Sequence, residues 1–265
     1  MSSIKTFYQK PLVKETTFLI INSILAGFIL SMAAVASIFA PYIESTRLAK
    51  GFMFSFGLLV IILFELKLFT GMIANAPYTP AKKWWTLGVC LVFNAVGGFI
   101  GASIARGAFG SKVIDSAATT LGDKLIASGV DISAGSMFLS AVLCGMCMTI
   151  AVLGCRAAKE KNFSATFLVV LPVMVFILCG FEHSIANLIY VFLAGAAWTG
   201  KVWLLIGMSV LRNLVGGIII PVCKLLENKR YLAETPQNQT KEESTTPAEK
   251  PQSITEEKTN KPKKK

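Results

Sequence analysis

The chain has 265 residues, of which 54% are hydrophobic and only 15% are charged, and it carries a formal net charge of +11. Soluble globular domains carry roughly 25% charged residues, so this composition excludes an ordinary soluble enzyme, a disordered protein and a collagen-like rod. It predicts an all-α polytopic membrane protein. The basic residues lie between apolar runs and near the C-terminus rather than on one face with interleaved aromatic residues, which argues against nucleic acid as a partner.

Six apolar segments are long enough to be membrane-spanning helices, because ~20 residues rising ~1.5 Å each cross a hydrocarbon core of ~30 Å. In chain order they cover residues 17–40, 51–73, 84–104, 137–154, 165–179 with a continuation to 196, and 203–223. We expect a long loop over residues 105–135. Residues 1–16 are expected to be a cytoplasmic N-terminal segment, residues 17–226 the six-span transmembrane domain, and residues 227–265 a disordered tail rich in Lys, Glu and Pro.

The distribution of Lys and Arg predicts how these spans are oriented. Six spans place both termini on one side, and that side also holds the Lys82–Lys83 pair, residues 156–161 and the basic tail. The opposite side holds fewer basic residues. Because Lys and Arg accumulate on the cytoplasmic side of a membrane, we expect a multi-pass protein of the plasma membrane with both termini in the cytoplasm and the lipid bilayer as its surroundings.

The second and fifth segments are interrupted by charged residues and glycine. Glu65 and Lys67 precede Phe69-Thr70-Gly71 in the second, and Gly180-Phe-Glu-His183 interrupts the fifth. Each is the middle segment of a three-segment half, a pattern typical of an inverted repeat whose two broken helices meet at a binding site. Irregular backbone at this depth is tolerated only where it lines a cavity or is buried in protein.

Charged side chains inside a bilayer cost roughly 2.5–3.5 kcal/mol each on insertion scales, so those of Glu65, Lys67, Glu182 and Arg212 are expected to be paired, to line a cavity or to reach the interface. Glu182 is expected to hold His183 or to pair with Lys67. His183 is the one histidine of the chain, and an unperturbed pKa of ~6.5 would let it exchange protons near neutrality. Its place beside a glutamate in a broken helix favours a functional role over a packing role.

The sequence predicts no metal centre, no cofactor and no enzymatic activity. It has a single histidine, no HExxH motif and no pair of histidines at ligand spacing. The cysteines lie in or beside apolar runs, which is typical of small packing residues rather than of a disulfide framework. They are Cys90, Cys144, Cys147, Cys155, Cys179 and Cys223.

Several motifs resemble those of the formate/nitrite transporter family, and the resemblance covers residues 14–222. Gly180-Phe-Glu-His-Ser-Ile-Ala-Asn187 is similar to the family's central-histidine motif, which is highly specific. Leu68-Phe-Thr-Gly71 resembles the loop of the family's broken second helix, and Phe54-Ser-Phe-Gly-Leu58 precedes it at the family's spacing. Phe93-Asn94 through Gly97-Gly98 and Asn213-Leu-Val-Gly-Gly217 resemble the small-residue motifs of the third and sixth helices.

The resemblance implies an aquaporin-like inverted repeat of six helices with broken second and fifth helices, assembled as a homopentamer with one pore in each protomer. It implies a channel or transporter for small monovalent weak-acid anions such as formate, nitrite, hydrosulfide, acetate or lactate. Protons are the expected co-substrate, because the anion would pass two apolar constrictions around the central histidine in protonated form.

The resemblance also implies which residues form the pore. The polar centre would comprise Thr70, Glu182, His183 and Asn187, to which we add Lys67. The apolar constrictions would comprise Phe54, Leu58, Leu68, Phe69, Met148 and Phe176.

Two positions depart from the family pattern. The family usually has an acidic residue where this chain has Lys67, and Asn where it has Gly145. A lysine at the first position resembles the divergent subgroup that includes hydrosulfide channels. Three alternatives stay open, of which the first two are a pore for neutral small solutes on the same fold and an integral-membrane enzyme that uses Glu182, His183 and the cysteines. A purely structural scaffold is a third.

Overall fold

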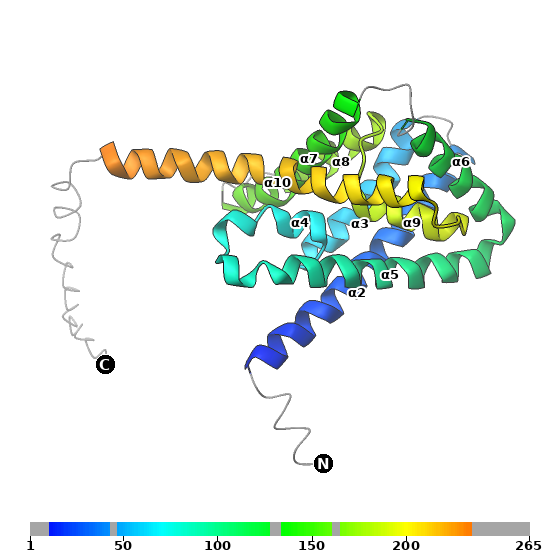
Figure 1. Cartoon of the computed structure of the whole chain (residues 1–265), viewed down its shortest axis with the longest axis horizontal. Coiled ribbons are helices and arrows are strands. Elements are labelled where there is room, and N and C mark those ends of the chain that lie inside the picture. Colours follow the sequence, from blue (N-terminus) through cyan, green and yellow to red (C-terminus); the bar gives the residue numbers. More distant parts are fainter. Residues whose placement is uncertain (1–10, 43–46, 128–133, 161–164, 235–265) are drawn as a thin grey trace, which may run out of the picture. The chain divides into compact units, whose positions relative to one another are not determined.

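The computed structural model describes residues 11–42, 47–127, 134–160 and 165–234, and every regular element within them is helical (Figure 1). The chain divides into two compact units, Met1–Lys224 and Leu225–Lys265. In the second unit, the described residues continue as helix to Glu234. The disorder predicted from residue 227 therefore does not hold for residues 227–234, and residues 235–265 lie outside the described part of the chain.

The first half of the membrane domain consists of two long helices and a broken one between them. The long helices are α2 (Pro11–Phe39) and α5 (Trp85–Phe109). The broken one comprises α3 (Arg47–Leu63) and α4 (Phe69–Ile73), and short 3₁₀ turns at Ala40–Tyr42, Ala76–Tyr78 and Ala81–Lys83 connect the elements.

The second half repeats this order. Long helices α7 (Ala134–Glu160) and α10 (Gly200–Glu234) flank a broken helix comprising α8 (Ala165–Leu178) and α9 (Ser184–Ala194). The predicted breaks in the second and fifth spans are therefore present. Several helices continue beyond the predicted apolar segments, because hydropathy marks the part within the hydrocarbon while the helical backbone extends into the interface.

By length and composition, four helices can each cross a bilayer alone: Val13–Phe39, Ala81–Phe109, Leu139–Ala158 and Gly200–Asn228. The two broken spans supply shorter apolar helices. Large apolar side chains face outward from the helices, for example Phe18, Phe56 and Trp203, which are 59%, 65% and 60% exposed. Such outward apolar surface suits lipid or a neighbouring protein and not water.

The long loop predicted for residues 105–135 is wrong, because α5 continues to Phe109 and a further helix, α6 (Ser111–Ala127), follows it. Helix α6 is amphipathic: Val113, Ala117 and Leu121 recur every four residues and are buried. It packs mainly on α9. Its mixed composition hides it from a search for apolar spans, yet it brings a charged residue to the site described below.

Close helix contacts hold the long helices of each half together. A side-chain carbon at Gly97 of α5 would overlap the carbonyl oxygen of Ile24 in α2. At the related place in the second half, a side-chain carbon at Gly216 of α10 would overlap the carbonyl oxygen of Val142 in α7. Glycine at these positions lets the backbones approach, as small residues do in membrane helix pairs.

Candidate functional site

Both breaks are made by the same backbone turn. After α3, the N–H of Glu65 donates to the carbonyl of Ile62 and that of Leu66 to Ile61, at 3.2 and 2.9 Å. After α8, the N–H of Gly180 donates to Ile177 and that of Phe181 to Phe176, at 3.2 and 2.8 Å. This is the Schellman pattern, which requires a left-handed residue: here Glu65 (φ 53°) and Gly180 (φ 68°).

One asparagine then fixes each break. Oδ1 of Asn94 in α5 accepts from the N–H of Phe69 at 2.7 Å, while its Nδ2 donates to the carbonyls of Ser23 and Lys67. Because the side chain is fully buried, its bonds to the N–H of Phe69 and the carbonyl of Lys67 replace water for backbone groups at the break, while its bond to the carbonyl of Ser23 joins the break to α2.

Asn213 in α10 makes the corresponding bonds in the second half. Its Oδ1 accepts from the N–H of Ser184 at 2.8 Å, and its Nδ2 donates to the carbonyls of Ala141 and Glu182 at 2.9 and 2.8 Å. The two asparagines thus place Leu68 and His183, the N-cap residues of α4 and α9, at related positions of the two halves.

His183 and Thr70 meet at the centre of the domain. Nε2 of the imidazole lies 3.0 Å from Oγ1 of Thr70, and Nδ1 accepts from the N–H of Ala186 at 3.2 Å. Since Nδ1 is the acceptor of a backbone N–H, the proton of the neutral ring lies on Nε2, which donates to the threonine. The ring stacks on Phe176 with centroids 5.7 Å apart.

The carboxylate of Glu182 is paired with a lysine that sequence analysis missed. Nζ of Lys124, on α6, lies 3.0 Å from its Oε2, and Nδ2 of Asn187 donates to the same oxygen at 2.7 Å. Asn187 also donates to Ser209 at 3.0 Å. Among the described residues the carboxylate contacts neither His183 nor Lys67, the two partners expected for it.

A cavity of about 400 Å³ opens on one side of the histidine. Its polar lining includes Lys50, Lys124, Glu182, His183 and Asn187. Asp123 lines it as well, so two cations face two carboxylates next to the central imidazole, an environment suited to small polar solutes.

A second cavity, of about 200 Å³, is lined by Leu58, Leu68, Glu65, Lys67 and Arg156. The half-buried Lys67 side chain belongs to this cavity and not to the one that holds His183. The structure therefore brings together Thr70, Glu182, His183 and Asn187, but it does not bring Lys67 to this polar centre.

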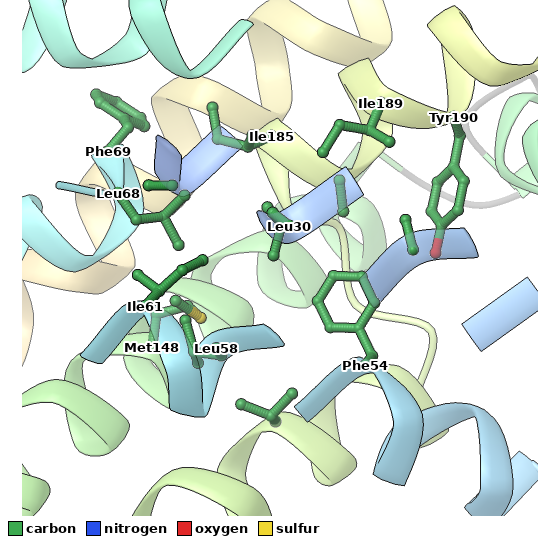
Figure 2. Packing of buried hydrophobic residues seen from close by; sticks show 14 of the residues in the cluster. Leu30, Phe54, Leu58, Ile61, Leu68, Phe69, Met148, Ile185, Ile189 and Tyr190 are labelled. Carbon is green, nitrogen blue, oxygen red and sulfur yellow. The ribbon is translucent and has the colours of Figure 1, made fainter. Parts of the chain in front are cut away.

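Apolar side chains border both cavities, with Phe176 at the first and Leu58 and Leu68 at the second. The residues predicted to form the constrictions are each at most 2% exposed and belong to one packed cluster. Figure 2 labels five of them together with Leu30, Ile61 and Ile185. The rings of Phe54 and Phe176 meet edge to face, with centroids 5.7 Å apart. The predicted constriction residues are Phe54, Leu58, Leu68, Phe69, Met148 and Phe176.

The remaining predicted features have simpler environments. Arg212 is 6% exposed within α10. A side-chain carbon at Gly145 would overlap the backbone of Asn213, so the asparagine usual at this position has no room here. No group of three or more His, Cys, Asp or Glu side chains suited to a metal occurs among the described residues.

Comparison with known proteins identifies the family. The sequence profile described as "Formate/nitrite transporter" matches residues 4–225. The chain belongs to the formate/nitrite transporter family. This membership places it among integral, multi-pass membrane channels and transporters of anions rather than among enzymes.

Individual relatives agree with the family. The chain is 28% identical over 207 residues to a "Probable formate transporter" of Methanothermobacter thermautotrophicus, which covers 67% of this chain and 73% of that protein. Among solved structures, it resembles a "Pentameric formate channel with formate bound" with a TM-score of 0.65 and 20% identity, over 81% of this chain and 98% of that one.

A second solved structure, an "FNT family ion channel", also gives a TM-score of 0.65 at 20% identity, over 83% of this chain and 90% of that one. At this identity the likeness establishes the fold alone. The predicted aquaporin-like architecture with broken second and fifth helices is thereby confirmed.

Proposed function

We propose that this protein is a channel for small monovalent weak-acid anions, with formate, nitrite, hydrosulfide, acetate and lactate as the candidates. One observation carries the proposal: His183, hydrogen-bonded to Thr70, lies beside a polar cavity, and buried apolar side chains border both this cavity and a second one. The solved relative named as a formate channel with formate bound supports the same substrate class.

Passage of a bare anion through this region would be costly. Entry into an inside-negative cell costs about 2.3 kcal/mol per charge at 100 mV, a roughly fifty-fold disadvantage. Losing water at an apolar constriction adds a desolvation cost. Both costs fall when the anion takes up a proton before it crosses the side chains of Phe54, Leu58 and Phe176. We therefore infer that the anion is neutralised in the cavity beside His183.

Lys50 and Lys124 line this cavity and can donate hydrogen bonds to an anion there, beside the carboxylates of Asp123 and Glu182. Lys124 is already paired with Glu182, so the pair presents a hydrogen-bonding surface without a large net charge. The N-terminus of α9, which begins at Ser184, adds a favourable partial positive charge next to the histidine. On the other side, Lys67 and Arg156 do the same for anions that leave or enter through the second cavity.

The hydrogen bonds of His183 favour a neutral ring throughout the cycle. A second ring proton would go to Nδ1 and break the bond from the N–H of Ala186, which caps α9. Release of the Nε2 proton from a neutral ring would leave an imidazolate. We therefore propose that the histidine and Thr70 orient the anion by hydrogen bonds while the proton is supplied by water in the cavity.

The assembly and orientation belong to the same proposal. We infer a homopentamer with one pore per protomer inside residues 17–226, in line with the pentameric relative. We infer that both termini are cytoplasmic, in the plasma membrane. In support, Lys83 and Arg156 line one cavity while Lys50 and Lys124 line another, which is the partition of basic residues that charge counting predicts. Lys67 makes hydrosulfide the first anion to test within this class.

The test is anion uptake by proteoliposomes, with net current recorded at two external pH values for each candidate anion. We expect uptake to rise as external pH falls and to carry little current, because the anion and a proton move together. His183→Asn should abolish this pH-driven component, whereas Lys201→Gln, an exposed change at the start of α10, should leave it intact. Unchanged pH-driven uptake in His183→Asn would remove the histidine from the mechanism.

Three further outcomes test the alternatives and the role of Lys67. Uptake of glycerol or water that exceeds uptake of the acids would favour a pore for neutral solutes. Lys67→Glu should lower the rate or change the preference among anions; if both stay the same, Lys67 has a structural role only. Absence of flux for every anion would favour a scaffold.

A further inference from the structure

A third cavity, of about 270 Å³, lies next to the second one and is distinct from the polar centre. Three basic side chains line it, Lys67, Lys83 and Arg156, and no carboxylate residue is among its lining. Three cations around one hollow repel one another, and an anion that contacts all three would relieve this repulsion. The cavity therefore has the charge of an anion site.

The polar groups at the rim do not compensate these cations. The indole N–H of Trp84 donates to the carbonyls of Ala76 and Thr79, both at 3.2 Å, and the hydroxyl of Thr79 donates to Asn75 at 2.9 Å. Thr86 donates to the carbonyl of Lys83 at 2.7 Å. These side-chain donors at the rim are thus already bonded to backbone carbonyls. The cations are therefore the groups left to bind a ligand.

The cations keep most of their hydrogen-bonding capacity. Arg156 donates through one guanidinium nitrogen to Oδ1 of Asn75 at 2.6 Å. Among the described residues, its other nitrogens and the ammonium of Lys67 have no acceptor. Lys83 has only a loose ion pair with Glu15, 3.8 Å long, in which both side chains are more than half exposed. Exposed pairs of this kind are worth little, so Lys83 is available.

The position of the cavity suggests where its ligand comes from. Trp84, which lines it, and the neighbouring Trp85 are 52% and 48% exposed at the start of a membrane-spanning helix. Indole rings at such places lie at the level of the lipid headgroups. The cavity is therefore open to the zone that holds phosphate groups of lipids and phosphate dissolved in the cytoplasm.

We propose that this cavity, lined by Lys67, Lys83, Arg156 and Trp84, binds a phosphate group. A phosphate presents several charged oxygens in different directions and can engage three cations at once, with the guanidinium giving a paired contact. A monovalent permeant anion has too few acceptors and too little charge to satisfy all three. Lys67 and Arg156 also line the second cavity, so a phosphate bound here would share two of its cations with that cavity.

The test measures binding by the thermal stability of the purified full chain in neutral detergent, at constant ionic strength. The probes are inorganic phosphate, dihexanoyl phosphatidate, dihexanoyl phosphatidylcholine and chloride. A ligand that binds the folded protein raises the melting temperature with concentration, so an apparent affinity follows. We expect phosphate or phosphatidate to stabilise the wild type and the other two to have no comparable effect. This measurement does not depend on transport, so it tests the phosphate site even if the transport proposal fails.

Two neighbouring lysines provide a matched pair of variants. Lys83→Gln should weaken the apparent affinity about tenfold, because one charge-assisted hydrogen bond is lost. Lys82→Gln removes the same charge from the adjacent exposed residue, which does not line the cavity, and should leave the affinity unchanged. Glu15→Gln removes the carboxylate that competes for Lys83 and should strengthen binding severalfold.

The outcomes separate the ligand sources and decide the proposal. Phosphatidate that binds much more tightly than inorganic phosphate identifies a lipid headgroup, and equal binding identifies soluble phosphate. If Lys82→Gln and Lys83→Gln weaken phosphate binding equally, only the general surface charge matters and the proposed site is wrong. Stabilisation by chloride or phosphatidylcholine to the same extent as by phosphate would overturn it as well.

Discussion

The two broken spans share a backbone design but differ in the side chains placed on it. Glu65 and Gly180 occupy the same left-handed position of the same turn, and Asn94 and Asn213 make the same three hydrogen bonds. Where the first half has Lys67 and an apolar N-cap, Leu68, the second half has Glu182 and His183. The repeat gives both halves the same backbone, and the titratable side chains of the polar centre, Glu182 and His183, belong to the second half.

This difference also explains why the two cavities have different charged residues in their lining. In an inverted repeat the two half-helices run in opposite directions, so the residues just before them face opposite sides of the centre. Lys67 accordingly lines one cavity while Glu182 lines the other with Lys124. One cavity presents Lys67 and Arg156 together with Glu65, and the other presents the ion pair of Lys124 and Glu182 next to the histidine.

The largest expected effect comes from removing either asparagine. Asn94→Leu and Asn213→Leu each delete three buried hydrogen bonds and leave backbone groups unsatisfied at ~1–3 kcal/mol each, so each should lower the free energy of unfolding by about 3–6 kcal/mol. Thermal unfolding of the purified variants measures this. Asn22→Leu is the control, because its side chain makes one local bond to Phe18. If only one of the two asparagine variants loses this much stability, the two halves are not energetically equivalent.

The ion pair distinguishes the second half and should produce the next largest effect. Lys124→Gln leaves the Glu182 carboxylate, whose side chain is 10% exposed, with Asn187 as its remaining partner. Breaking a fully buried pair costs ~3–5 kcal/mol and an exposed one less than ~1, so we expect a loss of about 2 kcal/mol. The double variant with Glu182→Gln should recover part of this loss in a double-mutant cycle. Additive losses would show that the two charges do not interact.

Much of the fold follows from the sequence for simple physical reasons. A span needs a long apolar segment, so hydropathy finds α2, α5, α7 and α10, and charges inside an apolar segment mark the two breaks. The meeting of Thr70 with His183 follows from the family resemblance, since the two residues are 113 positions apart and no local pattern links them.

Helix α6 and the partner of Glu182 could not be found in the same way. The segment from Ser111 to Ala127 mixes apolar and charged residues, so it lacks the signal of a span, although the repeat of Val113, Ala117 and Leu121 every four residues was available as a helical pattern. The pairing of Lys124 with Glu182 depends on how α6 packs on α9, which is a tertiary contact and leaves no local trace in sequence.

The hydroxyl of Thr70 gives a smaller, more specific test of the centre. Thr70→Val removes the acceptor for the Nε2–H of His183 while keeping the shape, so it should cost about 1 kcal/mol of stability and reduce pH-driven flux several-fold. Thr70→Ser keeps a hydroxyl and should retain most of the flux. The measurement is weak-acid uptake by proteoliposomes. Equal flux in the valine and wild-type proteins would remove the hydroxyl from the proposed pathway.

A pair of small effects of opposite sign tests the shared turn itself. Glu65 holds a left-handed conformation that costs a residue with a side chain ~1–2 kcal/mol, whereas glycine accepts it freely at ~0.5–1 kcal/mol of extra chain entropy. Glu65→Gly should therefore stabilise the protein slightly, by about 0.5–1 kcal/mol, and Gly180→Ala should destabilise it by about 1–2 kcal/mol. Melting temperatures of both variants check the opposite signs. Destabilisation by Glu65→Gly would mean that the carboxylate, exposed at the edge of the second cavity, contributes more than the strain of its backbone.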